Sequence, residues 1–166
     1  MKAAIFFGSK SDAETMKKAA DVLTEFGVEY KAFVISAHRA GELLVQTIRE
    51  IEKDGFEVII AGAGLSAALP GVIAGHTVLP VVGVPLECVT PGKSNGLGGM
   101  DALLSVVQMP PQIPVASVGI GNAKNAAYLA VEILAVKYPE LKEKLLSFRK
   151  KLAEDAKANG GLGYEF

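Results

Sequence analysis

Short, mainly apolar segments alternate along the chain with longer segments in which apolar residues recur every three or four positions. The short segments span residues 3–7, 31–35, 58–61, 80–84 and 115–118. The first of them, residues 3–7, is continuously apolar, which is typical of a parallel strand that is buried on both faces, and the others are predicted to be strands as well. After the first run, Asp12 is placed to begin a helix and Gly27 to end it. The apolar stripe of this helix comprises Met16, Ala19, Ala20, Leu23 and Phe26.

Similar patterns predict further helices over residues 41–53, 100–107 and 122–136, and a helix of small residues after Gly62-Ala63-Gly64, with Pro70 in its first turn. Residues 85–99 combine two prolines with five glycines or asparagines, which predicts a loop.

A long charged helix is expected over about 139–158. Its narrow apolar seam predicts that this helix packs on a neighbouring subunit. The alternative is that it packs on its own domain. Residues 159–166 are expected to form a flexible tail. The seam comprises Leu141, Leu145, Phe148 and Leu152.

The alternation of strands and helices predicts an α/β fold. Strand–helix–strand units make right-handed connections, and they build a parallel sheet that is covered by helices on both faces. We therefore expect a flavodoxin-like three-layer sandwich with a five-stranded parallel sheet in the order 2-1-3-4-5, formed by one catalytic domain over residues 1–158. Ligands of such sheets bind beyond the carboxyl ends of the strands, where strands one and three diverge.

Composition narrows the functional classes. The 166 residues are 50% hydrophobic and 21% charged, with a formal net charge of −1, so the basic excess of a nucleic-acid-binding surface is missing. Glycines and Pro70 interrupt the longest apolar stretch, which argues against a membrane span. The single cysteine, Cys88, has no partner for an internal disulfide and is interpreted as an apolar filler. Without a basic leader, the chain is expected to be cytoplasmic.

The first two predicted strands end in residues that suit an anionic ligand. Gly8 allows a tight turn, and helix amides together with the hydroxyls of Ser9 and Ser11 could bind a phosphate, although a simple capped turn is equally consistent. The spacing is not that of a P-loop. Asp12 could cap the helix or bind ribose hydroxyls.

The second strand leads into Ser36, His38 and Arg39. An imidazole can both give and take a proton near neutral pH, and a guanidinium supplies a fixed positive charge. A structural role for His38 is the alternative, and His76 is interpreted as structural. Small residues after the third strand leave backbone amides open to a ligand, or else serve close helix packing. No metal-ligand cluster or flavin-stacking tryptophan is present in the sequence.

Taken in order, these motifs resemble the N5-carboxyaminoimidazole ribonucleotide mutase family of purine biosynthesis. Residues 8–12 with Met16, then 36–39, 62–64 and 69–71 carry the resemblance, and residues 79–85, 101–110, 114–116 and 125–127 extend it. It implies a homo-octamer whose sites include neighbouring chains, an imidazole ribonucleotide substrate, no cofactor and no metal. His38 would transfer the proton. The implied phosphate and ribose contacts are Ser9, Ser11, Ser36, Arg39 and Asp12, and the implied base contacts are Ala63, Gly64, Ser66, Ala67 and Leu69.

Two departures from the mutase pattern keep an alternative open. Ala68 stands where typical mutases carry a histidine, and Ser66-Ala67-Ala68-Leu69 resembles the related carboxylases, which add free carbon dioxide to aminoimidazole ribonucleotide. Arg39 and the run 107–110 resemble mutases, so the mutase is favoured. The loop over 87–99 is longer than usual for the family. A flavodoxin-like module that binds a nucleotide or a flavin is the third interpretation.

Overall fold

Five parallel strands form the central sheet of the computed structural model, which describes residues 1–90 and 93–158. Their spatial order is β2-β1-β3-β4-β7. The fifth predicted strand is β7, so the predicted order is confirmed. Register places Ile5 of β1 between Ala32 of β2 and Ile60 of β3. The strands are β1 (Lys2–Phe7), β2 (Glu29–Val34), β3 (Val58–Gly64), β4 (Val81–Leu86) and β7 (Ala116–Ser117).

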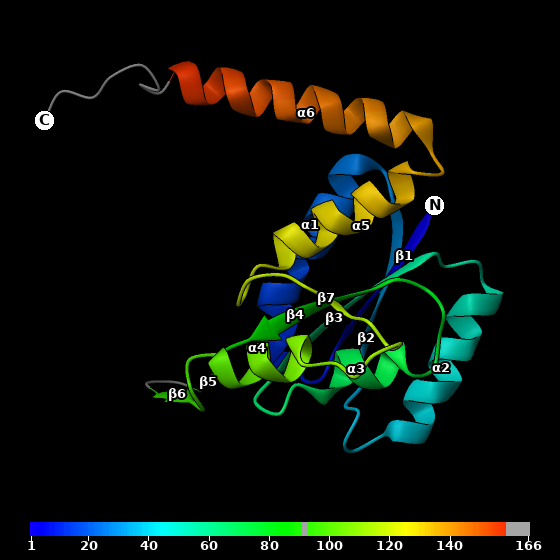
Figure 1. The fold of residues 1–166 in the computed structure, drawn as a ribbon, viewed down its shortest axis with the longest axis vertical. Coiled ribbons are helices and arrows are strands. Elements are labelled where there is room, and N and C mark those ends of the chain that lie inside the picture. Colours follow the sequence, from blue (N-terminus) through cyan, green and yellow to red (C-terminus); the bar gives the residue numbers. More distant parts are fainter. Residues whose placement is uncertain (91–92, 159–166) are drawn as a thin grey trace, which may run out of the picture.

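Helices cover both faces of this sheet (Figure 1). One face packs against α1 (Ala13–Phe26), α5 (Ala123–Ala135) and the first part of α6 (Pro139–Ala158). The other face packs against α2 (Gly41–Lys53), α3 (Ala68–Ala74) and α4 (Met100–Val107). Alternate residues of a strand point to opposite faces, so β1 contributes to both cores. The expected three-layer α/β sandwich is therefore present.

Close packing of α4 on the sheet depends on a glycine. A Cβ atom on Gly83 of β4 would lie 2.5 Å from Val106 Cγ1 and 2.9 Å from Val115 Cγ1. Both neighbours are short β-branched side chains with little freedom to move aside. Gly83 thus lets α4 lie directly against β4, next to the carboxyl edge of the sheet.

The segment predicted as a loop over 85–99 differs from that prediction. Its first residues extend β4 to Leu86, and β5 (Cys88–Thr90) pairs with β6 (Lys93–Asn95) in an antiparallel hairpin. The Oγ of Ser94 donates a hydrogen bond of 2.7 Å to Glu87 Oε1 across it. Each strand is only three residues long, so no periodicity distinguishes it from a loop in the sequence. In Figure 1 the hairpin follows the carboxyl end of β4.

The seam predicted on α6 is used in part by its own chain. Leu141 and Leu145 are buried in the core beside α1 and α5. The Phe148 ring lies 5.1 Å from that of Tyr128 and 5.8 Å from that of Phe26. Leu152 is 50% exposed, and the far end of α6 runs past α1 and α5 in Figure 1. Packing of this far end on a neighbouring subunit stays a prediction, and the predicted tail lies outside the described residues.

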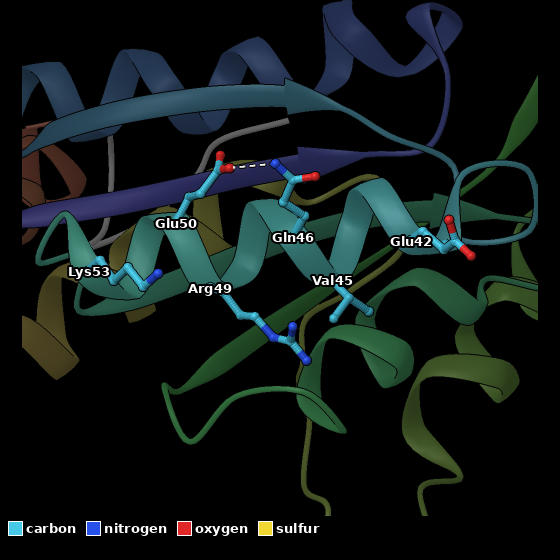
Figure 2. A pocket seen from close by; sticks show the side chains of 7 residues that line it. Glu42, Val45, Gln46, Arg49, Glu50 and Lys53 are labelled. Atoms are coloured by element: carbon cyan, nitrogen blue, oxygen red, sulfur yellow. Dashed lines mark hydrogen bonds between the residues drawn. The ribbon is translucent and has the colours of Figure 1, made fainter.

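The exposed face of α2 bears a hollow of about 710 Å³. Figure 2 shows Val45 and Arg49 extending outward from this helix, while Gln46 Nε2 donates a hydrogen bond of 2.8 Å to Glu50 Oε1. Every lining residue belongs to α2 itself. A hollow formed by the outer face of one helix brings no side chains together from different elements, so it is not the place where a ligand would be enclosed.

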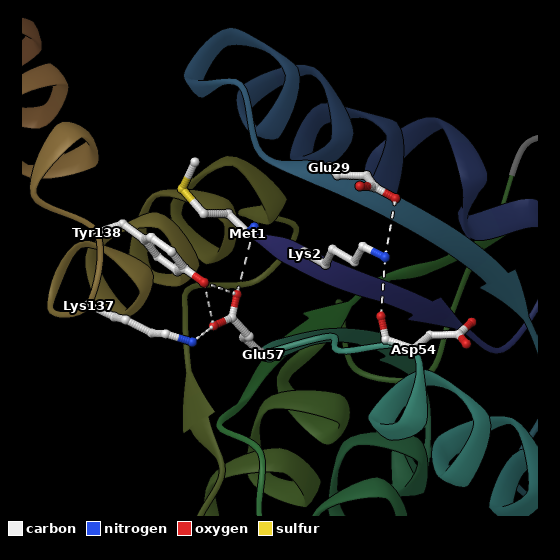
Figure 3. A network of polar contacts seen from close by, with 7 residues as sticks. All are labelled: Met1, Lys2, Glu29, Asp54, Glu57, Lys137 and Tyr138. Atoms are coloured by element: carbon white, nitrogen blue, oxygen red, sulfur yellow. Dashed lines mark hydrogen bonds and ion pairs between the residues drawn. The ribbon is translucent and has the colours of Figure 1, made fainter.

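A polar cluster connects the start of β3 with the link between α5 and α6 (Figure 3). Glu57 accepts hydrogen bonds from Lys137 Nζ at 2.6 Å and from Tyr138 Oη at 2.9 Å, and the N-terminal ammonium lies 3.9 Å from its carboxylate. Partial burial acts to raise the pKa of Glu57, but these donors and positive charges together outweigh it and lower the pKa. The hydrogen bond to Glu57 raises the pKa of Lys137.

Replacing Glu57 with Gln is expected to lower Tm at neutral pH by about 2–4 °C. A modest loss in the free energy of unfolding has an effect of this size in a chain of this length. The lowered pKa of Glu57 means that its stabilisation is present above the ordinary pKa of a glutamate and is lost as pH falls through the lowered value. The raised pKa of Lys137 means that its share is lost as the solution becomes strongly alkaline. Thermal melts of both proteins should therefore differ between about pH 5 and pH 10 and converge in strong acid. A difference in Tm that persisted unchanged into strong acid would contradict the assignment.

No helix within residues 1–90 and 93–158 combines the length and the apolar character that crossing a bilayer requires.

Candidate active site

The loop after β1 folds back on itself through its own side chains. Ser9 Oγ accepts hydrogen bonds from the Ser11 amide at 3.3 Å and from Ser11 Oγ at 2.9 Å, and Asp12 Oδ2 accepts one from the Ser9 amide at 3.0 Å. Asp12 occupies the N-cap position of α1, as one of the two predicted roles requires, but its carboxylate caps no amide of that helix. It closes the short 3₁₀ helix Lys10–Asp12 instead.

The carboxylate of Asp12 is partly withdrawn from solvent. Burial raises the pKa of Asp12, and the hydrogen bonds from the Ser9 amide and the Ser11 hydroxyl offset this only in part. Its oxygens remain acceptors, which makes it a group for binding hydroxyl donors rather than a phosphate. The two serines beside it carry the donors.

The loop after β2 is attached to the loop after β1. Arg39 Nη2 donates a hydrogen bond of 3.3 Å to the Gly8 carbonyl, which bridges the ends of neighbouring strands. The loop also turns on itself, since the Ala40 amide donates to the Ser36 carbonyl at 2.9 Å. Within residues 1–90 and 93–158 the His38 ring makes no hydrogen bond or ion pair and is exposed. Its two nitrogens are therefore available to a ligand.

The loop after β3 makes a tight turn. Leu65 has a φ of +54°, in the left-handed region that a branched side chain seldom adopts, and the Ala67 amide donates to the Gly64 carbonyl at 3.1 Å. Ser66 accepts a hydrogen bond of 3.0 Å on its carbonyl from Ser105 Oγ of α4. A Cβ atom on Gly64 would lie 3.0 Å from the Leu86 carbonyl oxygen, so a side chain here would press against the backbone of β4.

These three loops and β5 surround one cavity of about 300 Å³ at the carboxyl edge of the sheet. Ten of the eleven predicted site residues line it: Ser9, Ser11, Asp12, Ser36, His38, Arg39, Ala63, Gly64, Ala67 and Leu69. Ser66 is the exception: it does not line the cavity, and its carbonyl accepts the hydrogen bond from Ser105 of α4. The predicted meeting of the imidazole with the serine loop over a common cavity is therefore observed.

Five lining residues were not predicted. Gly8, Ala37, Leu65 and Ala68 lie inside the predicted motifs, so the spacing of those motifs already contained them. Cys88 comes from β5, and the interpretation of this residue as a mere filler overlooked its place in the cavity wall. No pattern around a single cysteine indicates a position in a wall, because the hairpin that places it is itself too short to read from the sequence.

Comparison with known proteins places the chain in a family. The family model described as AIR carboxylase matches residues 2–155. The chain belongs to the AIR carboxylase family. This finding confirms the family predicted from the ordered motifs.

Curated members of the AIR carboxylase family are similar to this chain over most of its length. A protein of Pyrococcus abyssi named N5-carboxyaminoimidazole ribonucleotide mutase is 57% identical over 148 residues, which cover 89% of this chain and 82% of that protein. A protein of the same name from Saccharolobus solfataricus is 51% identical over 93% of this chain and 94% of its own length. Among solved structures, Treponema denticola PurE matches with a TM-score of 0.77 at 30% identity, covering 95% of this chain and 97% of that one.

The polar groups around this AIR carboxylase family cavity are of mixed sign. Arg39 supplies a positive charge and Asp12 a carboxylate, and Ser9, Ser11 and Ser36 add hydroxyls to the same cavity wall. Within residues 1–90 and 93–158, no three His, Cys, Asp or Glu side chains gather so as to hold a metal ion. The groups that this cavity offers to a ligand are therefore hydroxyls, amides, one imidazole, one guanidinium, one carboxylate and one thiol.

Proposed function

We propose that this chain is an N5-carboxyaminoimidazole ribonucleotide mutase, which forms 4-carboxy-5-aminoimidazole ribonucleotide in purine biosynthesis. The observation that supports the proposal most is the cavity in which the free ring of His38 and the hydrogen-bonding loop around Ser9 face the same space. The name carried by the relatives at 46–57% identity supports the same activity.

The polar groups of the cavity suit the two ends of such a substrate. The phosphate is assigned to the hydroxyls of Ser9, Ser11 and Ser36 with the guanidinium of Arg39, because anions need donors. The ribose hydroxyls are assigned to Asp12, whose carboxylate accepts. The imidazole base and its carboxylate then lie toward Ala63, Gly64, Ala67 and Leu69, on the side of the cavity formed by β3 and the loop that follows it. Ser66 acts in this arrangement through the shape of its turn rather than by direct contact.

The proposed reaction needs only one mobile proton. The bond between the exocyclic nitrogen and the carboxyl carbon breaks, its electron pair returns to nitrogen, and His38 donates a proton there. The ring carbon then attacks the released carbon dioxide, and His38 takes the proton that this carbon loses. Holding carbon dioxide beside the ring converts a bimolecular attack into a positioned one, which is worth up to roughly 7–11 kcal/mol. Proton transfer by His38 adds about 10²- to 10⁴-fold.

Assembly into a homo-octamer in the cytoplasm is part of the proposal. His38 and Arg39 are exposed in the single chain, and so is Leu65, an apolar side chain of the cavity wall that is 44% exposed. A neighbouring subunit that covers them would keep water from the released carbon dioxide. The resemblance of the motifs supports eight copies, which sedimentation of the purified protein would test.

The direct carboxylase remains the alternative, because Ala68 lines the cavity where typical mutases carry a histidine. Substrate labelled with ¹³C in the carboxyl group, supplied in buffer with unlabelled bicarbonate, separates the two reactions. A mutase retains the label in the product, whose ultraviolet absorbance gives the rate, and it shows little turnover of aminoimidazole ribonucleotide with bicarbonate. Loss of the label, with fast turnover of the uncarboxylated substrate, would establish the carboxylase instead. A yellow protein with tightly bound flavin would favour the third interpretation.

A further inference from the structure

We propose that Ser105 is a positioning residue, which holds the turn 64–67 in the shape that forms one side of the cavity. This inference rests on the proposed function and adds a residue outside the cavity to it. Its basis is one hydrogen bond of 3.0 Å from Ser105 Oγ to the Ser66 carbonyl, across 39 positions of sequence.

The turn needs external support. Leu65 is held at a φ of +54°, and residues in sparsely populated backbone regions persist only where their surroundings hold them. Within the turn, the hydrogen bond from the Ala67 amide to the Gly64 carbonyl is the one backbone bond that closes it among the described residues. The bond to Ser105 fixes the peptide group that joins Ser66 to Ala67, and Leu65 and Ala67 on either side of Ser66 both line the cavity.

The helix that carries Ser105 is a firm support. Ala102 and Val106 of α4 are 0% and 1% exposed, and Val106 lies against Gly83 of β4. A serine in a helix commonly returns its hydroxyl to a carbonyl of its own preceding turn. Ser105 bonds instead to a segment that precedes it by 39 residues. The Ser105 hydroxyl therefore anchors the turn 64–67 in the cavity wall to the packed helix α4.

Loss of this bond should affect the chemical step more than binding. The phosphate and ribose are assigned to the loops after β1 and β2, which Ser105 does not contact. The turn 64–67 borders the region assigned to the base and the released carbon dioxide, where small displacements of reacting groups cost rate. Ser105 should thus act on kcat, with KM left close to its normal value.

The experiment compares Ser105→Ala, Ser105→Thr and Thr47→Val with the unmodified protein. Alanine favours the helix, so Ser105→Ala is expected to fold. It should lower kcat about tenfold while KM changes less than about twofold, and hydrogen exchange of amides in the peptide 62–70 should become faster. Ser105→Thr keeps a hydroxyl and should restore at least about half of kcat. Thr47→Val removes a 2.8 Å bond from Thr47 Oγ1 to the Leu43 carbonyl in α2 and should leave kcat unchanged.

Several results would overturn the inference. An unchanged kcat in Ser105→Ala, with or without a lower Tm, would exclude a positioning role for Ser105 and leave it at most a role in stability. Unchanged amide exchange in 62–70, or failure of threonine to restore the rate, would exclude the hydrogen bond as the cause. If the unmodified protein turned over no imidazole ribonucleotide at all, the proposed function would fail, and the exchange measurement would still decide whether Ser105 holds the turn.

Discussion

Replacing His38 with Asn is expected to lower kcat by at least about 10²- to 10⁴-fold, the share that a positioned general acid–base group supplies. Asparagine keeps a polar side chain of similar reach but cannot exchange a proton in this way. The side chain is exposed and makes no hydrogen bond within the described part of the chain, so the Tm and circular dichroism of the variant should match those of the unmodified protein.

The second histidine supplies the matched control. His76 lies just beyond the end of α3, is exposed and does not line the cavity. The change His76→Asn should leave kcat unaltered, when both variants are assayed by the ultraviolet absorbance of the carboxylated product. A His38→Asn protein that kept most of its activity would exclude the proposed proton transfer.

Replacing Arg39 with Ala is expected to raise KM by about 10- to 100-fold, since hydrogen bonds to charged groups are worth about 1.5–3 kcal/mol. Among the described residues the guanidinium is the one permanent cation lining the cavity, whose wall also includes the serines assigned to the phosphate. Arg39→Lys keeps the charge but loses the planar pair of donors, so its KM should fall between those of the other two proteins. Initial rates over a range of substrate concentrations give these values.

Arg49 on the outer face of α2 is the matched control for this change. It lines the separate hollow shown in Figure 2 and contributes nothing to the cavity. Arg49→Ala should leave KM unchanged, and inorganic phosphate should inhibit the unmodified protein more strongly than Arg39→Ala. An unaltered KM in Arg39→Ala would place the phosphate elsewhere.

The order of the sheet was readable from the sequence because its central strands β1, β3 and β4 are buried on both faces, although the edge strand β2 is mostly exposed. Ile5 and Phe6 point to opposite cores, yet both are almost fully buried, and a continuous apolar run is the signature of that environment. Each run was followed by a helical stripe, which requires parallel strands and leaves few possible orders. The hairpin was missed, because Cys88-Val89-Thr90 is too short to show a period and the nearby prolines and glycines favoured a loop.

The cavity was predicted less completely than the sheet. Ser9 and His38 stand directly after apolar runs, so the rule that ligands bind at strand ends was enough to find them. Contacts between distant segments could not be predicted. No sequence pattern indicates that Ser105 contacts Ser66 or that Cys88 lines the cavity. For Asp12 both predicted roles were compatible with the sequence, and only the fold shows that its carboxylate accepts from the Ser9 amide.

The contact between Arg39 and the Gly8 carbonyl affects how tightly an anion is bound. A free arginine side chain samples many rotamers, and freezing them on binding costs entropy. Here the guanidinium is already anchored through one of its five N–H donors, while the others stay available. An arriving anion thus meets a receptor that has been ordered during folding, so less of the interaction energy is consumed in immobilising it.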